Sequence, residues 1–143
     1  MSWVPLPKND VKTNFEISDN IALTYGSQYF DLHNEFELEK FEQNDFENSL
    51  KLYWKKCFGN LKTEPIRIVL CHNVINHFVI LNSNENIEDK SLNEITFFPS
   101  SERENIESFT ERAKPNQDDD ILYFFEFGKI LRINCEFIEL KIL

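Results

Sequence analysis

The chain has 143 residues, of which 41% are hydrophobic, and 25 acidic residues against 15 basic ones give it a net charge of −10. This length suits a single domain with one core, and the low glycine and proline content argues against a disordered or collagen-like chain. The negative charge disfavours binding to nucleic acid or to anionic membrane surfaces and attracts cationic partners, although acidity also has the simpler effect of keeping a protein in solution.

The predicted elements are mostly short β-strands. Runs rich in β-branched and aromatic residues, several of which alternate with polar residues, are typical of strands. In chain order they are residues 14–18, 20–25, 49–56, 65–72, 77–82, 94–98 and 121–127. The sequence therefore predicts a mainly β or α+β domain, 1–143, with an antiparallel sheet of about 7–9 short strands.

The stretch YFDLHNEFELEKFE, residues 29–42, places acids and a histidine close together and raises the question of an active site. From Phe30 to Glu39 its apolar residues occupy even positions and its charged residues odd ones, with Asn34 as the only break in the apolar series, which predicts a strand with a charged outer face. Alternate side chains of a strand stand parallel, roughly 6.5–7 Å apart, so at most two neighbours such as Asp31 and His33 could share an ion. A solvated face or an acidic contact surface is therefore favoured over a metal or catalytic site. The acids concerned are Glu35, Glu37, Glu39 and Glu42.

One short amphipathic helix is predicted at residues 102–113. Ser101 followed by Glu104 is typical of a capping box, and Ile106 and Phe109 begin an apolar stripe that ends before Pro115. We expect this helix to lie on a face of the sheet.

The end of the chain predicts a β-hairpin. Gly128 and Lys129 fit a two-residue type II′ turn, in which glycine takes the position that needs a positive φ. This register places Phe124 opposite Ile133 and Leu122 opposite Cys135. These four residues and Leu131 are expected on one face of the hairpin, which we predict to be the core face. The apolar phase then changes near Phe137, which indicates a bulge or a break.

The opposite face of this hairpin is too apolar to be left in water, so a helix, a second sheet or a partner should cover it. Its residues are Tyr123, Phe125, Phe127 and Ile130 beside Arg132 and Asn134.

Other combinations of reactive residues have weak support. Alternation puts Cys71 and His72 on opposite faces, and His77 is not at zinc spacing, so a buried cysteine and two histidines that flank loops are favoured. The run from Asp118 through Asp119 to Asp120 lacks the spacing of a calcium loop and predicts a solvated loop or a contact to a basic partner. No GxSxG, HExxH or GxxxxGK[ST] motif occurs, and we expect no enzyme, no metal and no other cofactor.

Cysteine usage and the start of the chain predict a cytoplasmic protein. The three cysteines, Cys57, Cys71 and Cys135, form no CxxC pair and are expected to be reduced, partly buried thiols. The first ten residues lack the pattern of a signal peptide, and no stretch approaches the roughly 20 apolar residues of a membrane span.

Three segments carry a family resemblance: YGSQYFDLHNEFELEKFEQND at 25–45, SLKLYW at 49–54 and YFFEFGKILRINCEFIELKI at 123–142. The Leu-His segment ending in Glu-Leu at 32–38 and the I-x-C-x-x-I-E-L pattern at 133–140 resemble small, acidic, sheet-rich immunity proteins of bacterial polymorphic-toxin and contact-dependent growth inhibition systems. The chain departs from that pattern at Asn34, where an aspartate often follows the histidine. The resemblance implies a non-enzymatic protein that neutralises one toxin by binding it, and it assigns no binding residue.

Many bacterial toxins that cut nucleic acid are basic, and an acidic protein would associate with them quickly. We therefore predict a contact surface with Tyr123 or Phe125 as an aromatic anchor. Its acidic residues would be Glu35, Glu37, Glu39, Glu42, Asp118, Asp119 and Asp120.

Two other classes remain open. An oligomerising protein would bury the aromatic hairpin face against a second copy. A small-ligand binder or enzyme would assemble its site from residues distant in sequence, with a pocket lined by His72, His77 or Cys71.

Overall fold

The computed structural model describes residues 11–59, 61–62, 66–104, 114–116 and 118–143, and in these residues the protein is all-β. The strands of the small sheet are β2 (Glu16–Ser18), β3 (Ala22–Tyr25) and β4 (Gln28–Asp31). The large sheet has seven strands, namely β1 (Lys12–Thr13), β5 (Phe36–Asn44), β6 (Ser49–Lys56), β7 (Arg67–Leu81), β8 (Leu92–Pro99), β9 (Asp119–Phe125) and β10 (Ile130–Ile142). The helical turn η1 (Ser100–Glu102) has three residues, so no described helix is long enough to cross a membrane.

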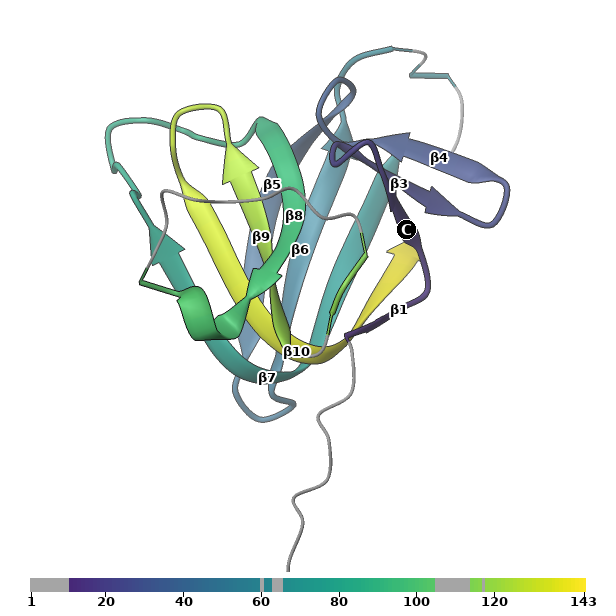
Figure 1. The fold of residues 1–143 in the computed structure, drawn as a ribbon. Coiled ribbons are helices and arrows are strands. Elements are labelled where there is room, and N and C mark those ends of the chain that lie inside the picture. Colours follow the sequence, from purple (N-terminus) through teal and green to yellow (C-terminus); the bar gives the residue numbers. More distant parts are fainter. Residues whose placement is uncertain (1–10, 60, 63–65, 105–113, 117) are drawn as a thin grey trace, which may run out of the picture.

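The predicted antiparallel sheet is confirmed. The large sheet has the order β5-β6-β7-β10-β9-β8 with antiparallel neighbours, and the short strand β1 adds to β10 in parallel. The sheet curls, so that its edge strands β5 and β8 approach each other (Figure 1). The N–H of Leu38 in β5 donates to the carbonyl of Lys90, two residues before β8, at 2.9 Å.

The small sheet closes the same core. Asn20, between β2 and β3, accepts the N–H of Ile95 in β8 at 2.7 Å and donates its side-chain amide to the Ile95 carbonyl at 3.0 Å. Leu23 and Phe30 of the small sheet belong to one buried cluster with the inner residues of the large sheet. In the centre of this cluster the rings of Trp54 and Phe125 stack in parallel, 6.2 Å apart.

Residues 30–38 largely keep the predicted alternation, which ends at the register shift after Leu38, but the prediction of one continuous strand is wrong. The chain turns between β4 and β5, where the Asp31 carboxylate accepts the backbone N–H of Asn34 at 2.9 Å and its side-chain amide at 2.8 Å. The even positions are nevertheless buried as expected, namely Phe30, Leu32, Phe36 and Leu38.

The two strands predicted at 65–72 and 77–82 are one long, bent strand, β7. At the bend Val74 has a φ of +60°, and the carbonyl of Asn48 accepts the N–H groups of Val74 and Ile75 at 3.1 and 3.4 Å. Opposite this bend, the residues that β10 contributes to the core cluster change from odd positions, ending at Cys135, to even positions, starting at Ile138. The apolar pattern predicted this change.

The predicted register of the C-terminal hairpin is wrong by three residues. Ile130 pairs with Phe124, because the connection is a longer loop whose N–H groups at Phe127 and Lys129 donate to the carboxylate of Asp89 at 3.0 and 2.9 Å. A shift by an odd number exchanges the faces of a strand. The core face of β9 therefore carries Tyr123 and Phe125 and not Leu122 and Phe124.

The opposite face of the hairpin, which we expected something to cover, forms a second buried cluster. It contains Phe98, Leu122 and Ile130, with Leu81 and Phe124 packed against it. Ser101, the predicted N-cap, lies inside the turn η1, which starts after Pro99 and has no side-chain cap, so that prediction is wrong. Most of the helix predicted at 102–113 falls on 105–113, outside the described residues.

Candidate protein-binding surface

The glutamates predicted as a contact surface lie on β5 or just before it, and each has a cation close by. The ion pairs are Glu35–Lys56 at 3.7 Å, Glu37–Lys90 at 3.3 Å, Glu39–Arg67 at 3.3 Å and Glu42–Lys40 at 2.9 Å. Exposed pairs of this kind stabilise a fold little, but they cancel much of the local charge. These four glutamates are therefore a weaker attraction for a cationic partner than their number suggests.

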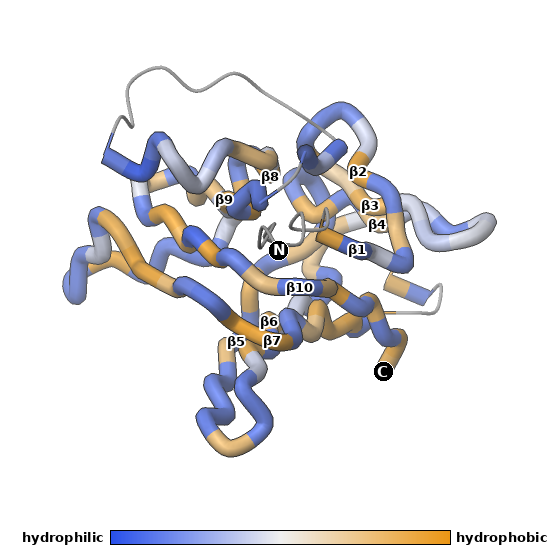
Figure 2. Tube along the Cα trace, turned by 60° about the horizontal axis from the view of Figure 1, so that its bottom comes forward, coloured by the Kyte–Doolittle hydropathy of each residue, from blue (hydrophilic) through white to orange (hydrophobic). Residues whose placement is uncertain are grey.

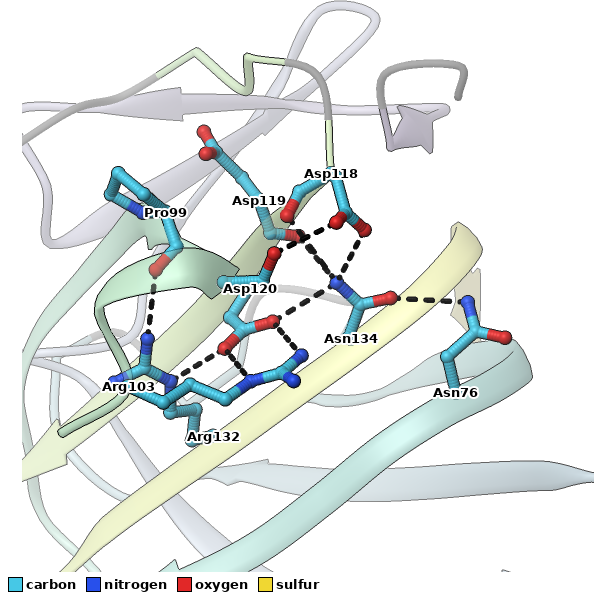
Figure 3. A network of polar contacts seen from close by, with 9 residues as sticks. Asn76, Pro99, Arg103, Asp118, Asp119, Asp120, Arg132 and Asn134 are labelled. Carbon is cyan, nitrogen blue, oxygen red and sulfur yellow. Dashed lines mark hydrogen bonds and ion pairs between the residues drawn. The ribbon is translucent and has the colours of Figure 1, made fainter. Parts of the chain in front are cut away.

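Asp120, predicted to be solvated, is instead fully buried at the start of β9. Its carboxylate accepts two hydrogen bonds from Arg103, at 2.8 and 2.9 Å, one from Arg132 and one from the side-chain amide of Asn134 at 3.0 Å (Figure 3). Burial alone would raise the pKa of the Asp120 carboxyl, but these hydrogen bonds outweigh burial and lower its pKa. The carboxylate thus joins β9, β10 and the segment after η1.

The neighbouring aspartates also take part in the fold. Asp119 is 1% exposed and accepts the N–H of Asn116 at 2.7 Å, so the prediction of a solvated loop is wrong for it as well. Asp118 is partly exposed and accepts the hydroxyl of Ser100 at 2.8 Å and the amide of Asn134 at 3.3 Å.

The two predicted acidic groups do not form one surface. Glu37 contacts Lys90 just before β8 begins, whereas Asp119 pairs with Pro99 at the other end of β8. Seven residue steps along a strand separate the ends of β8 by about 23 Å. The predicted anchors Tyr123 and Phe125 are 0% and 3% exposed, so their rings belong to the core.

His72 is buried inside the core. Its Nδ1 lies 3.1 Å from the carbonyl of Leu50 and its Nε2 lies 2.7 Å from the hydroxyl of Tyr123. The neutral ring therefore donates to Leu50 and accepts from Tyr123, and burial lowers the pKa of His72 to about 4. Both ring nitrogens of His72 form hydrogen bonds within the chain, so neither nitrogen is directed at a ligand pocket.

Cys71 and His72 point to opposite faces as predicted, since the thiol lies near Lys51 and Lys141 while the ring contacts the core. His72 and His77 both lie within β7, so the expectation that they flank loops is wrong. Within the described part of the chain, no group of three or more His, Cys, Asp or Glu side chains is placed to hold a metal ion.

A surface that sequence reasoning missed lies where β7 bends. The tip of the β5–β6 hairpin contacts the bend through the hydrogen bonds of Asn48, and the pairing of β7 with β10 places Phe137 opposite Asn73. Figure 2 shows this hairpin projecting from the body of the molecule, mostly blue with a short apolar segment at its tip. We name the surface the bend patch; it comprises Asp45, Phe46, Glu47, Val74, Glu136 and Phe137.

The bend patch combines exposed apolar groups with unbalanced negative charge. Phe46 is 99% exposed, and Phe137 is 41% exposed. Asp45, Glu47 and Glu136 form no ion pair with any described residue, but Glu47 acts on Lys141, whose pKa is raised mainly by Glu139 and also by Glu47. With Lys12 of β1 beside Phe137 and the Glu139–Lys141 pair included, four acids and two bases leave a net charge of −2. In the sequence, the signal for this surface is a single aromatic residue inside the polar turn NDFEN.

Val74 adds backbone strain to this surface. A β-branched residue in the left-handed region is a rare outlier, and that conformation costs roughly 1–2 kcal/mol. The side chain of Val74 is also 36% exposed, so its packing in the fold explains only in part why a valine occupies this strained position.

We expect Val74→Asn to leave the free energy of unfolding unchanged or to raise it, because asparagine tolerates the left-handed region. The matched change Val79→Asn, at a partly buried position further along β7 without a positive φ, should lower it by about 1–2 kcal/mol. Urea unfolding of both variants measures the difference. Equal losses in the two variants would show that Val74 is not strained.

No protein-family model matches the chain, and neither a curated protein nor a solved structure matches it. The resemblance to immunity proteins therefore stays a prediction.

Proposed function

We propose that this protein is a non-catalytic binding protein that captures a cationic protein at the bend patch, in the manner of an immunity protein that neutralises its toxin. One observation carries the proposal: Phe46 is 99% exposed at the tip of a projecting hairpin, between two acids. A phenylalanine in that position contributes nothing to the core. Its burial against a partner would recover the hydrophobic stabilisation that the free chain forgoes.

The arrangement of the bend patch resembles the energetic centre of a protein interface. Aromatic anchors that fill a pocket on the partner supply most of the binding energy, while a polar or charged rim excludes water and selects the partner. Here Phe46 would be the anchor, with Asp45 and Glu47 in the rim. The acids and the net charge of −10 would speed the encounter with a basic partner.

The strain at Val74 supports the same surface. Residues held in rarely populated backbone conformations cluster at functional sites, where a function outweighs the loss of stability. An exposed valine at the bend gives the partner a second apolar contact beside Phe46.

The partner we propose is a basic toxin domain, nucleases included, whose active surface is covered when the complex forms. An acidic surface that takes the place of phosphate groups would block such a domain without any chemical step.

The proposal is tested with the product of the gene directly upstream. We expect Phe46→Ala to weaken its binding by about 30-fold or more, the loss typical of an interface hot spot. The matched control is Phe58→Ala, which removes a 56% exposed phenylalanine beyond the opposite end of β6 and should change the affinity less than about twofold. Isothermal titration calorimetry measures both. Equal effects of the two changes on the affinity would show that the bend patch is not part of the interface.

A further inference from the structure

The second half of β7 has an edge with no strand beside it. β10 pairs with β7 up to Leu81, whereas β6 pairs with β7 only from Arg67 to Asn73. Beyond the hydrogen bonds of Asn48 to Val74 and Ile75, no described residue forms a backbone hydrogen bond with the β6 side of residues 76–81. In Figure 1 this end of β7 lies at the outer margin of the sheet, beside β10.

This edge carries neither charges nor proline, two of the features that protect edge strands, and the bulge of β7 at Asn76 lies only at its start. Residues 73–82, NVINHFVILN, contain no lysine, arginine, aspartate, glutamate or proline, in a chain of which 28% is charged. Phe78, Val79, Ile80 and Leu81 are all partly exposed, and much of this strand is orange in Figure 2. Natural edge strands that stay unpaired are usually blunted by charges, proline or bulges, because a bare apolar edge invites a further strand.

We propose that an extended, basic segment of the partner protein adds to this edge of β7 as an additional strand. Main-chain hydrogen bonds would provide affinity, and alternate side chains would provide specificity. Phe78 and Ile80 pack against the core and Leu81 against the outer cluster, so the added strand would meet an apolar row on each face. The basic character of the segment rests on the function proposed above, whereas the geometry of the edge does not.

Charge favours a basic partner over a second copy of this chain. Asp45 and Glu47 lie near the start of the edge, next to Asn48, and Glu85 lies in the loop that follows its end. An antiparallel pairing of two copies would bring Asp45 and Glu47 of each copy toward Glu85 of the other. A segment with lysine or arginine at both ends would instead find an acid at each end.

Three basic residues also lie near this edge. Arg103 and Arg132, which after burial lower the pKa of His77, both pair with the buried carboxylate of Asp120, and Lys129 lies near the end of the edge. The ammonium of Lys129 lies 4.5 Å from the centre of the Phe125 ring, which is buried in the core.

The test is a titration of the isotope-labelled chain with a peptide of about nine residues, valine alternating with threonine between pairs of lysines, followed by NMR. We expect shifts and slower amide exchange at alternate residues of 76–81. A peptide with glutamates in place of the lysines should bind at least about tenfold more weakly. The absence of shifts at this edge at millimolar peptide would overturn the proposal, and equal binding of the acidic peptide would overturn its charge component.

Two proline variants separate the edge from the fold. Successive residues of a strand direct their N–H groups to opposite sides. One of the two variants Val79→Pro and Ile80→Pro therefore loses a hydrogen bond to β10, and the other loses only an N–H group on the free edge. The variant that unfolds like the wild type should lose peptide binding. Unchanged peptide binding by that variant would contradict strand addition, and if neither variant folds, the wild-type titration decides.

The outcomes for this edge and for the bend patch are distinguishable. If the upstream gene product binds through Phe46 while the peptide leaves 76–81 unperturbed, only strand addition fails. If the basic peptide binds the edge but the upstream gene product does not bind the chain, only the proposed function fails.

Discussion

Replacing Asp120 with asparagine is expected to lower the free energy of unfolding by about 3–5 kcal/mol, the usual loss when one partner of a buried ion pair is removed. Arg132 is 1% exposed, and its guanidinium donates to Asp120. Without the carboxylate, Arg132 keeps its charge in a buried site and Arg103 loses a bidentate partner. Urea unfolding at neutral pH measures the loss.

The matched control is Glu39→Gln, which removes one charge from the exposed ion pair with Arg67. It should leave the midpoint of unfolding unchanged within error, because exposed pairs stabilise little. If Asp120→Asn behaves like this control, the buried cluster of Figure 3 does not hold β9 and β10 together.

Lowering the pH from 6.5 to about 4 is expected to reduce the free energy of unfolding by about 3 kcal/mol through His72 alone. The folded-state pKa of about 4 lies below the ordinary value of 6.5, so the unfolded chain binds more protons in this range. The stabilisation is complete above pH 6.5 and is lost as the pH falls. Urea unfolding at several pH values between 7 and 4 measures this slope.

The control for this slope replaces both side chains of the buried hydrogen bond, as His72→Leu with Tyr123→Phe, so that no buried hydroxyl is left unpaired, although the carbonyl of Leu50 loses the donor that His72 provides. This double variant should lack most of the pH dependence between 6.5 and 4. An unchanged slope would mean that His72 is not buried in its neutral form.

Local patterns predicted much of the fold. The strand expected at 49–56 is β6 with the same bounds, because Leu50, Leu52 and Trp54 alternate with polar residues and turn signals stand on either side. The register of the β9–β10 hairpin could not be predicted from such local patterns. It depends on Asp89, far from the hairpin in sequence, whose carboxylate holds the loop open beyond a two-residue turn.

The candidate surface was harder to predict than the fold. Glu37 and Glu39 look like free acids in the sequence, because their partners Lys90 and Arg67 come from other parts of the chain. Asp120 looks like part of a solvated loop for the same reason, because its partners Arg103, Arg132 and Asn134 lie more than ten residues away in sequence. Phe46 stands out in the sequence only as one aromatic residue in a polar turn, and its exposure follows from the projection of the hairpin beyond the sheet, which that pattern does not show.

The most direct measurement is calorimetric titration of the upstream gene product into the full chain at about 50 mM and about 300 mM salt. We predict a one-to-one complex whose affinity falls with salt, because acids steer the encounter, but persists at the higher salt, because Phe46 is buried in the interface. The absence of binding at both salt concentrations would contradict the proposed function.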